Sequence, residues 1–219
     1  MKKVIITLLV SIFYMTSASA DMGVNIGLSG NAGLFAASGK EVDTGPNQTE
    51  TTKASEQGEA GWSSLFIEKT LGDRFTVGVD FVMNSLSTET TEARRQDKTT
   101  GTSSSNVENK IAIDFDNLMT YYVAFNVNEN LYAKVGMLNV DIVTKETLGT
   151  GSTYGNTDMD GTVLGVGYNG SFGNSAFIRL EGNYMKFDGT SVTSSTGVNV
   201  VHLNQLDGVS GKIAIGKSF

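Results

Sequence analysis

The 219-residue chain contains no cysteine, one proline and one histidine. Without cysteine it has no disulfide, no thiolate metal site and no cysteine nucleophile, and a single histidine excludes a multi-histidine metal cluster. Lysine and arginine number 16 against 23 acidic residues, for a formal net charge of -7. No basic run is present that would neutralise a series of phosphates. We therefore expect no nucleic-acid partner, no metal and no cofactor.

Long hydrophobic runs are equally scarce. One mostly apolar stretch, Val4 to Tyr14, follows Lys2 and Lys3 and precedes the small-residue sequence Ala18-Ser19-Ala20. This arrangement is typical of a secretory signal peptide, so we expect residues 1–20 to be cleaved and residues 21–219 to form the exported unit. A membrane-spanning helix needs about 20 apolar residues, and a chain without one can cross a membrane only as a closed β-barrel.

Apolar and polar residues alternate along most of the remaining chain. Phe75, Val79 and Phe81, for example, alternate with Thr76 and Asp80. A period of two is that of a β-strand with two chemically different faces. Eight segments follow it, beginning near Met22, Ser63, Phe75, Ile111, Leu131, Thr162, Ala176 and Val209. We expect the apolar face to meet lipid at Met22, Val24, Val79, Phe81, Val123, Ile178 and Ile213.

The connections between these segments differ sharply in length. Residues 72–74, 128–130 and 170–174 are short turns rich in Gly, Asn and Asp, which favour tight hairpins. The other connections are long and hydrophilic, near residues 39–60, 88–106, 143–160 and 188–207. Strict alternation of short turns with long loops is typical of a transmembrane barrel. The prediction is therefore an all-β fold, an eight-stranded antiparallel up-and-down β-barrel with short periplasmic turns and long extracellular loops that could bind a ligand.

The strand count has one open alternative. Apolar residues keep odd positions from Ile111 to beyond Met119, which is longer than a membrane strand requires. A turn at Asp116-Asn117, with residues 198–203 recruited as another strand, would give ten strands. We favour eight, because the parity of the apolar positions is unbroken across Asp116-Asn117 and a turn need not preserve it.

Most charges within the strands lie on the face opposite the aliphatic residues. They are three acids and three bases: Glu68, Asp80, Lys134, Arg179, Glu181 and Lys212. Facing lipid near the midplane, each basic residue would cost up to roughly 2–4 kcal/mol. We expect these side chains to point into the lumen and to form an ion-paired network. Asp114 and Asp116 share the parity but are expected above the bilayer.

Two groups of residues offer alternative sites. His202 has Asp207 and Ser210 as sequence neighbours, which suggests a hydrolytic triad, but nearness in sequence does not supply hydrogen-bond geometry. Glu146, Asp158 and Asp160 suggest a calcium site, but they lack the spacing of an EF-hand loop, and solvated acids are the favoured interpretation. We predict that the protein is not an enzyme.

The signal peptide, the eight alternating segments and the last strand together resemble small bacterial outer-membrane β-barrels of the OmpA/OmpX/opacity-protein type. The resemblance covers the whole mature chain and implies the outer membrane of a Gram-negative bacterium. In that family a terminal aromatic residue and the alternating apolar residues before it are read by the outer-membrane assembly machinery. The matching residues are Ile213, Ile215 and Phe219, whereas Lys217 departs from the pattern.

The interior of an eight-stranded barrel is only wide enough for its own side chains. Membrane anchoring with display of four hydrophilic loops is therefore the leading hypothesis, in a structural or adhesive role at the cell surface. A porin-like conduit for small solutes is the alternative, and a lipid-modifying enzyme is a more distant one.

Overall fold

The computed structural model describes residues 23–45, 48–98, 104–149, 152–173 and 175–219, so the expected signal peptide and Met22 lie outside the described residues. The strands are β1 (Val24–Gly45), β2 (Gln48–Leu71), β3 (Phe75–Val82), β4 (Leu86–Ser87), β5 (Thr91–Lys98), β6 (Ser104–Asn126), β7 (Leu131–Thr147), β8 (Thr157–Phe172), β9 (Ala176–Phe187), β10 (Thr190–Thr193) and β11 (Asn199–Ser218). Within these ranges, no helix is long and apolar enough to span a membrane.

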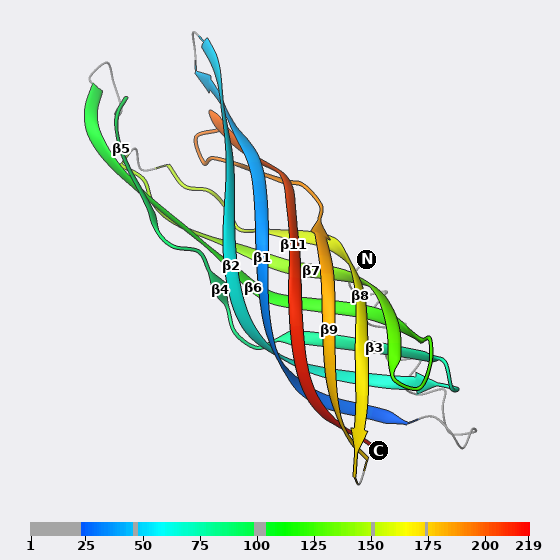
Figure 1. The fold of residues 1–219 in the computed structure, drawn as a ribbon. Helices are drawn as coiled ribbons and strands as arrows, with labels where there is room; N and C mark the ends of the chain where they lie inside the picture. Colours follow the sequence, from blue (N-terminus) through cyan, green and yellow to red (C-terminus); the bar gives the residue numbers. More distant parts are fainter. Residues whose placement is uncertain (1–22, 46–47, 99–103, 150–151, 174) are drawn as a thin grey trace.

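Eight of the strands form a closed antiparallel ring (Figure 1). The order is β1-β2-β3-β6-β7-β8-β9-β11, and pairing of β1 with β11 closes it. At the seam, Phe219 N donates to Val24 O at 2.8 Å and Val24 N donates to Phe219 O at 3.2 Å. The short strands β4 and β5 pair with β6 above β3, and β10 pairs with β11 above β9. The predicted eight-stranded barrel is confirmed.

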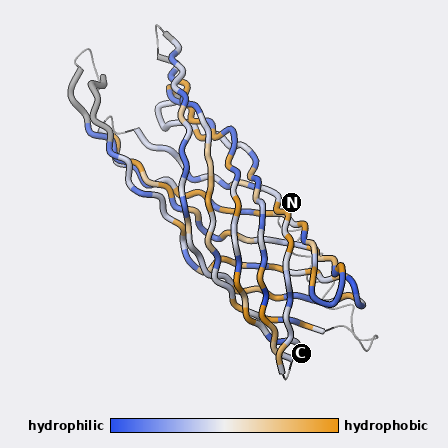
Figure 2. The backbone as a smooth tube through the Cα atoms, viewed as in Figure 1, coloured by the Kyte–Doolittle hydropathy of each residue, from blue (hydrophilic) through white to orange (hydrophobic). Residues whose placement is uncertain are grey.

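The outer wall carries the apolar face of the strands. Alternation of hydropathy is visible along the wall in Figure 2. Phe81, Val123, Ile178 and Ile213 are exposed, and Val24 and Val79 are half-buried. Other large apolar residues exposed on the wall include Leu28, Leu34, Leu65, Val135, Leu164, Val166, Leu180, Val209 and Ile215. The outer wall therefore differs from the surface of a soluble protein, because many of its exposed side chains are large and apolar.

The predicted long loops are mostly strand. We call the end of the barrel with the short turns the lower end and the opposite end the upper end. At the upper end β1 and β2 stay paired from the barrel to Gly45 and Gln48, and β5 pairs with β6 from Thr91 to Lys98. The expectation of loops over 39–60, 88–106 and 188–207 was wrong in this respect. Residues 49–59 of β2, for example, are rich in Thr and Glu and exposed on both faces, so they give no apolar alternation, yet pairing with β1 still orders them.

The eight-strand prediction was right, but the parity argument for it was wrong. The strand β6 is continuous through Asp116, yet its register against β7 shifts by one residue between Asp116 and Met119. Asn117 has a positive φ of 54° at this bulge, and its Nδ2 donates to Asp141 Oδ2 at 3.0 Å. A bulge reverses which residues face inward. Residues 198–203 belong mostly to β11 and add no ninth strand to the ring.

Candidate functional site

The lower half of the lumen holds a buried carboxylate, Glu68, on β2. Arg179 on β9 binds it with two nitrogens, at 2.5 Å from Nη1 to Oε1 and 3.1 Å from Nη2 to Oε2. The hydroxyl of Tyr122 donates to Oε1 at 2.6 Å, and Asn25 Nδ2 lies 3.3 Å from Oε2. Glu68 is 1% exposed, so its charge relies on these donors rather than on water. The contact joins residues 111 positions apart in the chain.

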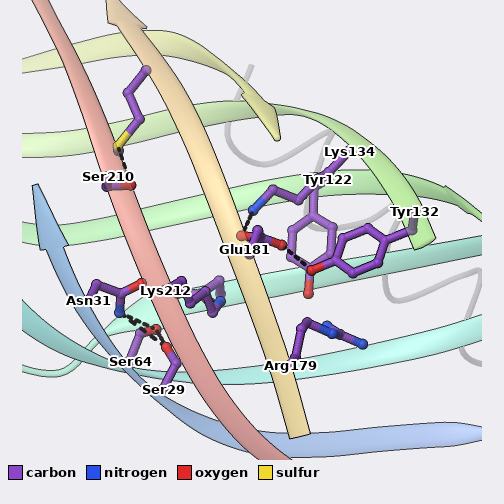
Figure 3. Close-up of polar contacts among 12 residues, drawn as sticks. Ser29, Asn31, Ser64, Tyr122, Tyr132, Lys134, Arg179, Glu181, Ser210 and Lys212 are labelled. Carbon is purple, nitrogen blue, oxygen red and sulfur yellow. Dashed lines mark hydrogen bonds and ion pairs between the residues drawn. The ribbon is translucent and has the colours of Figure 1, made fainter. Parts of the chain in front are cut away.

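A second carboxylate, Glu181, lies two residues above Arg179 on β9. Its Oε1 forms an ion pair with Lys134 from β7, and its Oε2 accepts a hydrogen bond of 2.5 Å from the hydroxyl of Tyr132 (Figure 3). Both members of the pair are buried. The ammonium of Lys134 also lies 5.2 Å from the centre of the Tyr122 ring. The two carboxylates therefore share one network of bases and tyrosines across the lumen.

The third ion pair joins Lys212 on β11 to Asp80 on β3, across the barrel. All six charged residues predicted for the lumen are buried, and the structure brings them together as three acid–base pairs. The Arg179 guanidinium also lies 5.1–5.3 Å from the rings of Phe66, Tyr132 and Phe177, within cation–π range. Sequence reasoning did not single out Tyr122 and Tyr132, although both share the parity of the inward charges.

Inward-facing glycines make room for these tyrosines. A Cβ at Gly167 would lie 2.2 Å from the Tyr132 ring, and a Cβ at Gly78 would lie 2.5 Å from the Tyr122 ring. Each glycine is on a strand adjacent to its tyrosine. The high glycine content of the chain therefore serves, at these two positions, to let an aromatic ring lie flat against the barrel wall.

A small polar cluster lies between β1 and β2. Ser29 Oγ and Ser64 Oγ are 2.6 Å apart, and Asn31 Nδ2 donates to Ser29 Oγ at 3.1 Å (Figure 3). Ser64 is fully buried. These uncharged groups lie beside the ion pairs, because Asn31 is directly opposite Lys212 in the register of β1 and β11.

The upper half of the lumen is apolar, which the sequence analysis did not anticipate. Its fully buried members include Leu138 and Val140 on β7, which are 2% and 1% exposed. The cluster comprises Trp62, Val82, Leu118, Leu138, Val140, Ile142, Met159, Val163, Met185, Phe187 and Leu206, with Ile113 and Phe115 packed against it. The inward parity of Leu138, Val140 and Ile142, shared with Lys134, was a signal that could have revealed it.

The residues of the predicted assembly signal lie at the lower end of the outer wall. Ile213, Ile215 and Phe219 are 61%, 57% and 71% exposed. The ammonium of Lys217 lies 5.1 Å from the centre of the Phe219 ring, so the residue that departs from the family pattern folds over the terminal aromatic.

The three residues of the alternative hydrolytic triad, Ser210, His202 and Asp207, do not contact one another in the structure. Ser210 Oγ contacts Met185 Sδ at 3.9 Å, and Asp207 accepts a hydrogen bond from Gln205. His202 Nδ1 instead lies 3.1 Å from Ser191 Oγ on β10. The structure therefore gives no Ser-His-Asp geometry at His202.

Two residues of the alternative calcium site, Glu146 and Asp160, also have separate partners. Glu146 Oε1 accepts from Tyr154 N at 2.7 Å, and Asp160 Oδ1 accepts from Asn139 Nδ2 at 2.7 Å. No cluster of acids and histidines suited to a metal ion occurs within the described ranges.

Ion pairs also occur above the barrel. Lys110 Nζ lies 2.8 Å from Glu92 Oε1 and 3.1 Å from Glu108 Oε1, and hydrogen bonds to both raise the pKa of Lys110. Asp114 pairs with Lys145, whose side chain lowers the pKa of Asp114 through a hydrogen bond. Asp114 lies on the upper part of β6, but the expected lumen parity was wrong, because the bulge at Asn117 turns Ile113 and Phe115 toward the lumen and Asp114 to the opposite face.

No family model matches the chain, and no curated protein matches it. Solved barrels do. The outer membrane protein OprG from Pseudomonas aeruginosa is 15% identical over 90% of this chain and 96% of its own, with a TM-score of 0.47. The outer membrane protease OmpT from Escherichia coli is 9% identical over 93% and 100%, with a TM-score of 0.47. Ail, the attachment invasion locus protein of Yersinia pestis, is 12% identical over 88% and 99%, with a TM-score of 0.39. These likenesses concern the fold and say nothing of activity.

Proposed function

We propose that this chain is an integral protein of the outer membrane of a Gram-negative bacterium. The closed ring satisfies the strand hydrogen bonds internally, which a lipid environment requires. The exposed aliphatic residues on the wall, such as Leu164 at 58% and Val166 at 67%, are stabilised by lipid rather than by water. Export of residues 21–219 after removal of residues 1–20 belongs to the same proposal.

We further propose that the barrel is a closed anchor. The observation that carries this is the set of three buried ion pairs packed with tyrosines across the lower lumen. Neutralised and hydrogen-bonded charges are stable in such a site, whereas a water-filled path would have to separate them. The apolar cluster above adds a second layer that carries no charged side chain for an ion. Both features argue against the porin-like conduit.

Conductance of the purified protein in a planar bilayer tests the closed anchor. We expect no steady openings from the unmodified protein. Reproducible openings of constant size would contradict the closed anchor and favour a conduit for small solutes.

The upper hairpins are proposed as the surface that acts outside the cell, in a structural or adhesive role. They are ordered by pairing rather than loose. The β7–β8 connection also docks on the β10–β11 turn, where Ser195 N donates to Thr153 O at 2.7 Å and Thr153 N donates to Ser195 Oγ at 3.0 Å. Such a joined, polar surface fits recognition of an external partner better than catalysis.

Removal of one hairpin tests this role with little damage to the barrel. Thr91 pairs with Ile111, so residues 92–110 can be replaced by an Asn-Gly turn. We expect the shortened protein to insert normally and to lose attachment of expressing cells to surfaces. Unchanged attachment after this deletion, and after an equivalent deletion of residues 40–53, would exclude adhesion through these two hairpins.

Insertion through the assembly machinery is the remaining part of the proposal. Deletion of Phe219 removes the residue that pairs with Val24 at the seam and caps the expected signal. We expect less protein in the outer membrane of cells and nearly normal spontaneous folding in detergent. Equal insertion in cells would contradict a role of Phe219 in assembly.

A further inference from the structure

The upper part of β2 has a free edge. On one side β2 pairs with β1 up to Gln48, but on the other side its pairing with β3 covers only Ser64 to Leu71. Among the described strands, none pairs with that other side of β2 from Gln48 to Ser63. This part lies above Leu65, the uppermost large apolar residue on the outward face of β2, so water rather than lipid surrounds it. In Figure 1 it stands apart from β5.

The backbone groups of this edge follow from the contacts at its lower end. Met83 N donates to Ser63 O at 3.0 Å, and Ser63 N donates to Asn84 Oδ1 at 3.0 Å, so both backbone groups of Ser63 point away from β1. Backbone direction alternates along an antiparallel strand. The N–H and C=O groups of the odd-numbered residues from Thr49 to Gly61 therefore point to the free edge, whereas those of the even-numbered residues pair with β1. The edge is roughly 40 Å long at about 3.4 Å per residue.

Little protects this edge from pairing with a further strand. Natural sheet edges are blunted by proline, by bulges, by lysine or by a covering segment. Residues 48–63 contain no proline and one lysine, Lys53, and their ladder to β1 has no bulge. Residues 49–59 are exposed on both faces. The edge formed by β10 and Ser194, by contrast, is covered by Tyr154, which forms a bridge to Ser194.

The charge along this edge selects the kind of strand that fits it. The upper part of β2 carries Glu50, Glu56 and Glu59 against Lys53 alone. Within the described residues, none of these three carboxylates forms an ion pair. Opposite charges across a strand pair stabilise the pair, and like charges destabilise it. A basic segment is therefore favoured, and a second copy of the same acidic edge is disfavoured.

We propose that the free edge of β2 binds a basic, extended segment of another protein as an added β-strand. Main-chain hydrogen bonds to the odd-numbered residues supply the affinity, and contacts with the three glutamates select for lysine and arginine. This inference rests on the proposed role of the upper hairpins in recognition outside the cell, and it names the class of partner. It does not depend on the ion pairs of the lumen.

The test titrates the full mature chain in lipid nanodiscs into a short fluorescent peptide of alternating Lys and Thr, followed by fluorescence anisotropy. We expect saturable binding. The same peptide with every amide N-methylated keeps its charge but cannot pair as a strand, and a peptide with Glu in place of Lys reverses the charge. Both should bind at least about tenfold more weakly. Equal affinity for the N-methylated peptide would overturn strand pairing, and equal affinity for the acidic peptide would overturn the basic partner.

Proline at two positions removes donors from the free edge and leaves the ladder to β1 intact. Ser55 and Gln57 are odd-numbered, so their N–H groups point away from β1. The variant Ser55→Pro/Gln57→Pro should bind the basic peptide about tenfold more weakly and keep the unfolding midpoint of the barrel. Ser55→Ala/Gln57→Ala is the matched control, because it changes the same side chains, keeps both N–H groups and should bind normally. Equal affinity of the proline and alanine variants would refute the site.

Amide hydrogen exchange, measured by NMR on the mature chain, observes the pairing itself. Without peptide, the amides of Thr51, Lys53 and Ser55 should exchange fast, and those of Thr52 and Ala54, which pair with β1, should exchange slowly. Saturating basic peptide should slow the first set and leave the second unchanged. Slow exchange of the first set without peptide would mean that the edge is already paired. That result would overturn the proposal, and so would exchange that the peptide does not change.

Attachment of expressing cells separates this inference from the adhesive role on which it rests. If deletion of residues 40–53 abolishes attachment and Ser55→Pro/Gln57→Pro does not, the hairpin is adhesive and strand pairing is refuted. If neither change affects attachment but the peptide binds in a proline-sensitive way, the edge site is supported and the adhesive role fails. A proline-sensitive dimer of the mature chain without peptide, detected by analytical ultracentrifugation, would assign the edge to a second copy and overturn the basic partner.

Discussion

The lower and upper halves of the barrel interior are filled by opposite means. Below, three ion pairs, two tyrosines and Asn25 form one network of paired charges and hydrogen bonds, in which the Nε of Arg179 is left as a buried donor without a hydrogen-bond partner. Above, mainly aliphatic and aromatic side chains pack together, and none of them is charged. Polar groups there must each find a partner or be costly, whereas apolar side chains need only fill the space. The lower half is therefore specified by pairing and the upper half by shape, and their responses to mutation should differ.

Removal of one buried charge should have the largest effect. Arg179→Met leaves Glu68 charged and buried with only Tyr122 and Asn25 as donors, and should lower the free energy of unfolding by about 3–5 kcal/mol. Urea unfolding of the refolded protein in lipid measures it. The double variant Glu68→Gln/Arg179→Met removes both charges and should be clearly more stable than the single one. A double variant as unstable as Arg179→Met would show that shape, not charge, governs the lower half.

Truncation in the upper half should cost nearly as much for a different reason. Leu138→Ala leaves a cavity beside Val140 and Val163 and should lower the free energy of unfolding by roughly 2–5 kcal/mol. Val135→Ala on the same strand is the control, because Val135 faces outward at 55% exposure and leaves no cavity. Additivity of Leu138→Ala with Glu68→Gln/Arg179→Met would confirm that the two halves are independent.

A methyl group added to the wall of the lower half should cost less. Gly167→Ala pushes the Tyr132 ring away from its bond to Glu181 and should lower the free energy of unfolding by about 1–3 kcal/mol. Gly182→Ala, where nothing lies within 4 Å, is the matched control. Equal unfolding midpoints for the two variants would mean that the ring is not held against the wall.

The bulge in β6, near the boundary between the two halves, should show the smallest effect. Asn117→Val forces a branched side chain into positive φ and should cost about 1–2 kcal/mol. Asn117→Gly adopts that φ without strain and should unfold within a few tenths of a kcal/mol of the unaltered protein. A stable Asn117→Val variant would indicate that β6 can be rebuilt without the bulge.

The sequence alone predicted the number of ring strands, the three short turns and the apolar outer face. Those features depend on local alternation and on glycine- and asparagine-rich turns, which are visible within a few residues. The same alternation selected the six lumen charges. A charged residue that alternates with outward-facing aliphatic residues must face the lumen, because facing lipid would cost free energy. The alternation failed at Asn117, where a single extra residue reverses the faces and leaves no mark in the composition.

Partner choice in the lumen was decided only by the tertiary structure. The alternation predicts that Arg179 faces inward, but only the strand order and register bring it to Glu68, 111 residues away. They also bring Lys134 to Glu181. The same holds for Lys212 and Asp80, which meet only because closure of the ring brings β11 and β3 to face each other across the lumen. Local periodicity sets the face of each side chain, and closure of the barrel sets its neighbours.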